Sequence, residues 1–234
     1  MKKRWILLIL AVAMLLSLAS CAAERYDGLY AVDDGSGLTF TVRGSGSRPK
    51  QISVRRDEEL LFTTKVKIPK SLGRMGGDYG FFVLDLNFDG YSDFMIADGV
   101  SGDCTSYLCY LYNTDLETYV RSDALSGLCN IKADPALEAV FAFTHTYTAE
   151  EAYLDVPAAY ISTDTTTKYK WRDGILTPHS RASITYYSET GMYCYSVSDY
   201  DSEAGEFSES DDKWLTPEEY KTYDMQFLYY FKEQ

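Results

Sequence analysis

Histidine is nearly absent from this chain, whose 234 residues include only His145 and His179. His145 lies between threonines in an alternating stretch, and His179 follows a proline. No serine stands in a Gly-x-Ser-x-Gly elbow, no glycine-rich loop has a phosphate-binding pattern, and no Cys-x-x-Cys pair marks a zinc site. The patterns of the common catalytic sites are therefore missing, and we expect that the chain is not an enzyme.

Basic residues are also scarce, with 22 Lys and Arg against 35 Asp and Glu and a net charge of −13. Residues 1–20 contain three basic residues and no acidic one, and removing those three positive charges from −13 leaves −16. Such a charge disfavours nucleic acid, because proteins bind its phosphates through basic side chains. It favours solubility outside the cell and could attract a basic protein partner. The alternative is a solvated acidic surface that has no partner.

Repeats and low-complexity tracts are absent, whereas tyrosine is abundant at 21 residues. Aromatic residues favour strands. Alternating runs between turn residues predict strands over 38–42, 51–55, 60–68, 81–84, 94–96, 106–112, 119–120, 140–147, 158–162, 165–171, 175–176, 182–187 and 192–197. A capping box with proline at the first helical position predicts a helix from Pro217 to about Asp224. We expect a mainly β fold, with antiparallel hairpins in one propeller-like or sandwich-like domain and a short C-terminal helix.

The start of the chain has the pattern of a secretory signal. Lys2, Lys3 and Arg4 precede an apolar run over 5–16, which is too short to span a membrane with its flanks. The end of this segment, 18–21, resembles a bacterial lipobox, which implies that Cys21 becomes the acylated N-terminus. We therefore expect a signal peptide over 1–20, a lipid anchor, tether and early hairpin over 21–50, and a β-rich domain over 51–234. The protein would then lie in the cell envelope, anchored on the extracytoplasmic side of a bacterial membrane. The alternative is a cleaved secretion signal with a coincidental cysteine.

The stretch 85–93 places oxygen-bearing side chains at every second position, followed by a glycine and a final carboxylate. Hard cations such as Ca²⁺ take six to eight oxygen ligands. The candidate ligands are the side chains of Asp85, Asn87, Asp89 and Asp93 and the backbone carbonyl of Tyr91. Gly90 permits the sharp bend, because glycine adopts positive φ at no steric cost. The alternative is an acidic surface turn, since Asp-Gly is also a hairpin signal.

The spacing departs from an EF-hand, in which a glutamate closes the loop at position twelve between two helices. Here Asp93 closes the loop earlier, and both flanks are expected strands. The loop resembles the calcium loop of FG-GAP and VCBS-type repeats, found on β-hairpins of propeller-like proteins. It occurs once, which argues against a full propeller. The longer run 81–120 is similar to a family of extracytoplasmic bacterial lipoproteins, some of which are immunity proteins against secreted cell-wall hydrolases. The resemblance covers roughly 51–176.

Two further acidic stretches are weaker candidates for cation binding. The turn 98–103 could lend an oxygen to the ion in the loop 85–93, although a plain turn is the simpler interpretation. The stretch 199–212 contains seven acidic residues, but their spacing matches no ligand template, and a solvated loop is favoured.

Four cysteines remain if Cys21 is lipidated: Cys104, Cys109, Cys129 and Cys194. An even number outside the cytoplasm favours disulfides, and four cysteines allow three connectivities. Cys104 and Cys109 stand too close on one expected strand for an easy bridge, so each is expected to pair with a distant partner. The alternative is two or more free buried thiols.

Two functions of different classes fit these features. The first is a lipid-anchored β domain, stabilised by structural calcium, that binds a protein or a glycan at the cell envelope, with tyrosines as contact residues. The second is implied by the resemblance alone: an inhibitor or immunity protein against a secreted peptidoglycan hydrolase. The negative charge would steer a basic enzyme towards it.

Overall fold

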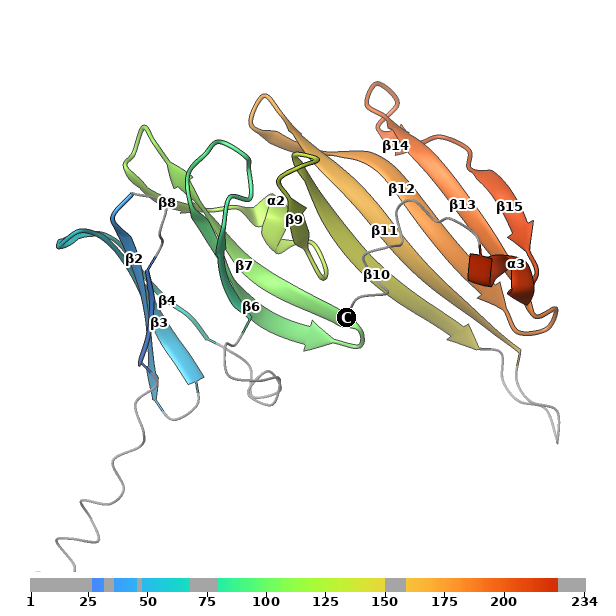
Figure 1. Cartoon of the computed structure of the whole chain (residues 1–234), viewed down its shortest axis with the longest axis horizontal. Helices are drawn as coiled ribbons and strands as arrows, with labels where there is room; N and C mark the ends of the chain where they lie inside the picture. Colours follow the sequence, from blue (N-terminus) through green and yellow to red (C-terminus); the bar gives the residue numbers. More distant parts are fainter. Residues whose placement is uncertain (1–26, 32–35, 46–47, 68–79, 150–158, 223–234) are drawn as a thin grey trace, which may run out of the picture. The chain divides into compact units, whose positions relative to one another are not determined.

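The computed structural model describes residues 27–31, 36–45, 48–67, 80–149 and 159–222 (Figure 1). The chain divides into two compact units, 1–68 and 69–234. The expected signal peptide and Cys21 lie outside the described residues.

The first unit contains one antiparallel sheet of four strands in the order β1-β2-β3-β4. Its strands are β1 (Asp27–Ala31), β2 (Leu38–Ser45), β3 (Arg48–Arg56) and β4 (Glu59–Lys65). Alternate apolar residues of the central strands are buried, namely Leu38, Phe40, Val42, Ile52 and Val54. Because side chains alternate across a strand, these residues share one face of the sheet.

The second unit begins with a four-stranded antiparallel sheet in the order β5-β6-β7-β8. Its strands are β5 (Phe81–Leu84), β6 (Asp93–Ser101), β7 (Cys104–Asn113) and β8 (Thr118–Arg121). A short helix, α2 (Asp123–Ser126), follows β8, and the Ser122 hydroxyl caps it by accepting a hydrogen bond from the Leu125 N–H at 3.3 Å. The loop between β5 and β6 is the predicted calcium loop.

The larger sheet of this unit has the order β14-β13-β12-β11-β10-β9, with β15 also paired to β13. Its long strands lie side by side in Figure 1. The strands are β9 (Lys132–Asp134), β10 (Ala139–Ala149), β11 (Tyr160–Arg172), β12 (Ile175–Tyr187), β13 (Met192–Asp201), β14 (Glu206–Phe207) and β15 (Asp211–Leu215). The helix α3 (Pro217–Thr222) follows β15. No helix in the described part of the chain has the length and apolar character that a membrane span needs.

One core joins the two sheets of the second unit. It contains Leu86 from the β5–β6 loop, Met95 and Cys109 from the smaller sheet, Leu125 of α2, Ile131, and Val140 and Ala142 of β10. Each of these side chains is almost completely buried. Burying a large apolar side chain contributes roughly 1.5–3 kcal/mol. The calcium loop and the larger sheet therefore share a core through Leu86.

The expected fold class is confirmed: the described residues form antiparallel sheets, and the short C-terminal helix begins at Pro217 as predicted. Several boundaries differ. The position after residue 50, expected to begin the β-rich domain, lies inside β3, and the division into units falls after residue 68. Residues 160–162 of the expected strand 158–162 and the expected strand 165–171 lie in the single strand β11, whereas residue 158 lies outside the described residues. The expected strands 175–176 and 182–187 lie in β12. Polar threonines and serines interrupt the apolar pattern there, but pairing with neighbouring strands continues, with one register shift between β11 and β12 at Lys168 and Tyr169.

The cysteines follow the expectation in part. Cys104 forms a disulfide with the distant Cys129, which links the start of β7 to the segment before β9. Cys109 and Cys194 are free and buried, so the expectation that each cysteine pairs with a distant partner is wrong for these two. Cys109 points into the shared core, whereas Cys194 belongs to β13 of the larger sheet, and burial raises the pKa of the Cys109 thiol to about 12.

Candidate functional site

The loop between β5 and β6 turns sharply through two residues with positive φ. Gly90 has φ 87° as expected, whereas Phe88, with φ 61°, was not foreseen. A left-handed conformation is costly for a bulky residue, but the Phe88 side chain packs against the shared core, which offsets that cost. The loop is therefore held by packing as well as by its glycine.

Carboxylates of the loop accept hydrogen bonds from its own backbone. The Asp85 carboxylate accepts from the Gly90 N–H at 2.8 Å and from the Asp89 N–H at 3.2 Å. The Asp89 carboxylate accepts from the Tyr91 N–H at 2.9 Å and from the Asn87 amide at 2.7 Å. These bonds fold the side chains of Asp85, Asn87 and Asp89 back over the turn, which brings their oxygens together.

Asp93 has a different environment, because it is completely buried at the start of β6. Its carboxylate accepts hydrogen bonds from the N–H groups of Leu86 and Tyr112, both at 2.8 Å. Burial raises the pKa of Asp93 to about 7; the two backbone hydrogen bonds lower it, and the nearby charges of Asp89 and Asp85 raise it further. Asp93 therefore ties the loop to β7.

Tyr91 lies at the surface of the loop, with 45% of the residue exposed. Its ring contacts that of Tyr112 with centroids 5.3 Å apart. Next to it, the Ser92 carbonyl accepts a hydrogen bond from the Tyr119 hydroxyl at 2.9 Å. These contacts anchor the end of the loop to β7 and β8.

The donor set fits calcium in kind. Asp85, Asn87, Asp89 and Asp93 offer side-chain oxygens within one loop, and a carboxylate oxygen that accepts one hydrogen bond keeps a lone pair for a cation. Hydrogen bonds from backbone N–H groups of the loop hold the carboxylates of Asp85, Asp89 and Asp93 on the same turn. In the described ranges, however, no three Asp, Glu, His or Cys side chains form a cluster of metal-binding geometry. Calcium binding is therefore a proposal, in which the Asn87 amide oxygen and the Tyr91 carbonyl oxygen would act as ligands besides the carboxylates.

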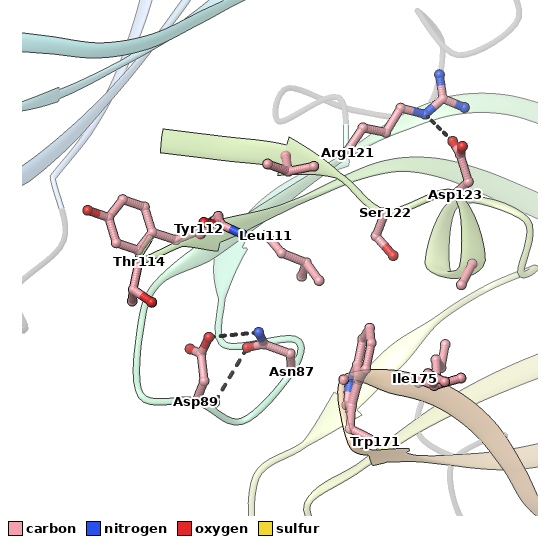
Figure 2. Close-up of a pocket in the computed structure, with 15 residues that line it drawn as sticks. Asn87, Asp89, Leu111, Tyr112, Thr114, Arg121, Ser122, Asp123, Trp171 and Ile175 are labelled. Atoms are coloured by element: carbon pink, nitrogen blue, oxygen red, sulfur yellow. Dashed lines mark hydrogen bonds and ion pairs between the residues drawn. The ribbon is translucent and has the colours of Figure 1, made fainter. Parts of the chain in front are cut away.

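A groove of about 510 Å³ opens beside this loop. Its lining comes from the loop, from β7 and β8, from the start of α2 and from the β11–β12 turn. The lining residues are Asn87, Asp89, Leu111, Tyr112, Asn113, Thr114, Val120, Arg121, Ser122, Asp123, Ala124, Trp171, Gly174, Ile175 and Leu176. Figure 2 shows Trp171 and Ile175 on one side of the opening, and Leu111 and Ser122 on the other.

Trp171 connects the groove to the loop. Its indole N–H donates a hydrogen bond to the Leu86 carbonyl at 2.9 Å, although the two residues are 85 positions apart. Across the groove, Arg121 and Asp123 form an ion pair at 3.0 Å. This combination of a fixed aromatic ring, aliphatic side chains and a few polar groups is typical of ligand-binding clefts.

The other acidic candidates lie apart from the loop. Residues 98–101 of the expected turn 98–103 belong instead to the nine-residue strand β6, and only Gly102 and Asp103 form a turn. That turn lies at the far end of β6, roughly 30 Å from Asp93 along the strand. In the stretch 199–212, the Asp201 carboxylate accepts backbone hydrogen bonds from Glu203 at 2.8 Å and Ala204 at 3.1 Å, which lower its pKa. Half of that stretch belongs to β13, β14 and β15, so it is not one continuous loop, but nearly all of its described residues are exposed, as expected for a solvated segment.

A histidine–carboxylate pair was missed from the sequence. The Nδ1 atom of His145 on β10 lies 2.7 Å from the carboxylate of Asp164 on β11. The two residues are direct partners in the strand register. Only knowledge of that register could have found the pair, which lies on the larger sheet and does not line the groove.

A row of tyrosines crosses the same sheet. Each ring contacts the next one in the row, and neighbouring ring centroids are 4.0–5.8 Å apart. The row consists of Tyr147, Tyr160, Tyr186 and Tyr193 on the strands and ends at Tyr220 of α3. Contacts between aromatic side chains on adjacent strands stabilise a sheet. Much of the tyrosine content is therefore explained by packing.

Comparison with known proteins finds little similarity. No family model matches this chain, and no curated protein matches it. Among solved structures, a Xanthomonas type IV secretion system related protein is similar, at 14% sequence identity and a TM-score of 0.40, over 79% of this chain and 92% of that one. This distant similarity supports no statement about function.

Proposed function

We propose that this protein is a lipid-anchored, calcium-stabilised β domain that binds a protein or a glycan at the bacterial cell envelope. The observation that carries the proposal is the groove of about 510 Å³ beside the loop 85–93. Its size is in the range of ligand-binding clefts, and its walls combine aromatic, aliphatic and polar side chains. Cys21 supplies the lipid anchor on the extracytoplasmic side of the membrane.

Calcium has a structural role in this proposal. Asp85, Asn87, Asp89 and Asp93, with the Tyr91 carbonyl, would hold the ion, which supplies positive charge among three carboxylates that otherwise repel one another. Because Asn87 and Asp89 also line the groove, the ordered loop forms part of the binding surface. No catalytic role is proposed, since Asp123 is paired with Arg121 and Asp89 is engaged by the loop backbone.

The test compares two exposed aliphatic residues at hairpin turns. Ile175, which is 66% exposed, lines the groove, whereas Leu137, 45% exposed, does not. Binding of the soluble chain 22–234, which lacks Cys21 and its lipid, to isolated bacterial envelopes is measured by co-sedimentation. We expect Ile175→Asp to abolish sedimentation and Leu137→Asp to leave it unchanged, because exposed substitutions barely affect folding. Equal sedimentation of both variants and the wild type would contradict a binding role for the groove.

A second function is favoured by the charge of −13 on the whole chain, namely inhibition of a basic peptidoglycan hydrolase. Opposite charges would accelerate association, and added salt would weaken it. The measurement is the activity of the basic hydrolases that the same bacterium secretes, with and without this protein, across a salt series. If the hydrolase activity is undiminished at every salt concentration, inhibition is excluded and only the first proposed function remains.

A further inference from the structure

One wall of the groove is an aromatic ring that is already fixed in place. The Trp171 indole donates its hydrogen bond to Leu86 at 2.9 Å, and the ring packs against the shared core. A side chain held in this way loses little further conformational freedom when a ligand binds. Sugar rings present faces of C–H groups, and a flat, preorganised aromatic ring offers apolar area that matches them.

The rest of the lining mixes aliphatic side chains with uncharged hydrogen-bonding groups. The aliphatic residues are Leu111, Val120, Ala124, Ile175 and Leu176, and the uncharged polar residues include Asn113, Thr114 and Ser122. A ligand with hydroxyl groups alone would leave the aliphatic wall unmatched, and a purely apolar ligand would leave the polar groups without partners. An acetamido group satisfies both, because it carries a methyl group beside an amide donor and acceptor.

The charges around the groove disfavour an anionic ligand. Asp89 and Asp123 are carboxylates, and Arg121 is the one base among the residues that line it. The Arg121 guanidinium is already paired with Asp123 at 3.0 Å. Because Asp123 and Arg121 neutralise each other, an anion would meet the carboxylate of Asp89 and no unpaired cationic side chain of the lining, whereas an uncharged ligand meets no such penalty.

From these features we propose that the groove binds an uncharged oligosaccharide whose sugars carry N-acetyl groups. This inference rests on the proposed function, since it assigns the ligand class of the same groove. Trp171 supports a sugar ring, Ile175 contacts the acetyl methyl group, and the polar residues of β7 and of the α2 cap bind hydroxyl and amide groups.

The test uses two ligands that differ only in the acetamido group: the tetrasaccharide of β-1,4-linked N-acetylglucosamine and the tetrasaccharide of β-1,4-linked glucose. Binding to the soluble chain 22–234, which lacks the lipid, is measured by isothermal titration calorimetry. We expect the N-acetylated ligand to bind about tenfold or more tightly than the glucose ligand, because only it satisfies both parts of the lining. Equal affinities would overturn the assignment of N-acetyl groups.

Two variants test the site itself. Trp171→Ala should reduce affinity at least about tenfold, and Ile175→Ala about threefold or more. Trp214→Ala is the matched control, because Trp214 is 53% exposed and does not line the groove. Ile175 is exposed, so its variant reports on binding even if Trp171→Ala unfolds the protein. Wild-type affinity in Ile175→Ala and in folded Trp171→Ala would overturn the proposal.

The result also separates this inference from the proposed function. If neither tetrasaccharide binds while Ile175→Asp still abolishes sedimentation with envelopes, the groove has another ligand, and only the sugar assignment is wrong. If Ile175→Asp has no effect on sedimentation and no tetrasaccharide binds, both proposals are wrong.

Discussion

The burial of Asp93 predicts that the stability of the metal-free protein falls as pH rises. The pKa of Asp93 increases from 3.8 to about 7 because the folded protein removes its carboxyl from water. The folded state therefore keeps a proton that the unfolded state releases between these two values. One pKa unit corresponds to 1.36 kcal/mol, so the contribution of this group is about 4 kcal/mol.

The sign follows from proton binding. Between pH 3.8 and about 7 the folded state binds more protons at Asp93 than the unfolded state, so the free energy of unfolding decreases with pH across this window. The stabilisation is fully present below the lower value and is lost as pH passes the upper one. Urea unfolding in EDTA between pH 4.5 and pH 8 measures this change.

Asp93→Asn supplies the comparison, because an amide has the shape of the protonated carboxyl and does not titrate. We expect its free energy of unfolding to depend on pH less steeply than that of the wild type, by about 4 kcal/mol over the whole window. Asp173→Asn, at an exposed turn position with φ 50°, is the control and should follow the wild type. Parallel curves for the wild type and Asp93→Asn would show that the burial of Asp93 does not control its protonation.

Three further predictions concern calcium, the disulfide and the lipid anchor. Millimolar calcium should raise the melting temperature of the wild type, because a hundredfold excess over Kd adds about 2.7 kcal/mol to the free energy of unfolding. Asp89→Ala should remove this response. Equal melting temperatures of both proteins with calcium and with EDTA would refute the metal site. Replacing Cys104 and Cys129 by serine opens a loop with a sequence separation of 25 and should cost about 3.5 kcal/mol in urea unfolding; an unchanged free energy of unfolding would show that the disulfide does not restrict the unfolded chain. In a chain that also carries Ile175→Asp, which removes binding by the groove, Cys21→Ser should move the protein from the membrane pellet to the soluble fraction on cell fractionation. Continued sedimentation with membranes would exclude lipid anchoring at this residue.

The hairpins and the loop 85–93 could be predicted from the sequence because their signals are local. Gly90 marks a turn with positive φ, and alternating residues mark the strands on both sides. The capping box also located α3, where the Thr216 N–H and hydroxyl donate to the Glu219 carboxylate at 2.8 and 2.9 Å. Each of these features depends on residues a few positions apart.

Features that depend on contacts between residues far apart in the sequence could not be predicted from the sequence. The threonine-rich part of β11 has no clear apolar alternation, so the sequence divided one strand into two, although pairing with β10 and β12 continues through it. The groove needs Trp171 beside the loop, and this contact spans 85 positions. Asp93 was predicted as a ligand from its spacing, but its complete burial and its hydrogen bond from Tyr112, 19 positions away on β7, could not be predicted.

Leu86 is the residue through which the loop and the groove depend on each other. Its N–H donates to the Asp93 carboxylate, and its carbonyl accepts from the Trp171 indole. Asp93 also accepts a hydrogen bond from Tyr112 of β7, which belongs to the smaller sheet, whereas Trp171 belongs to β11 of the larger sheet. The backbone N–H and carbonyl of the buried Leu86 therefore connect the loop to both sheets. A change that moves Leu86, such as filling or emptying a cation site in the loop, is expected to shift the Trp171 ring that is bonded to it. Ligand affinity in the groove should therefore respond to substitutions in the loop that never touch the ligand.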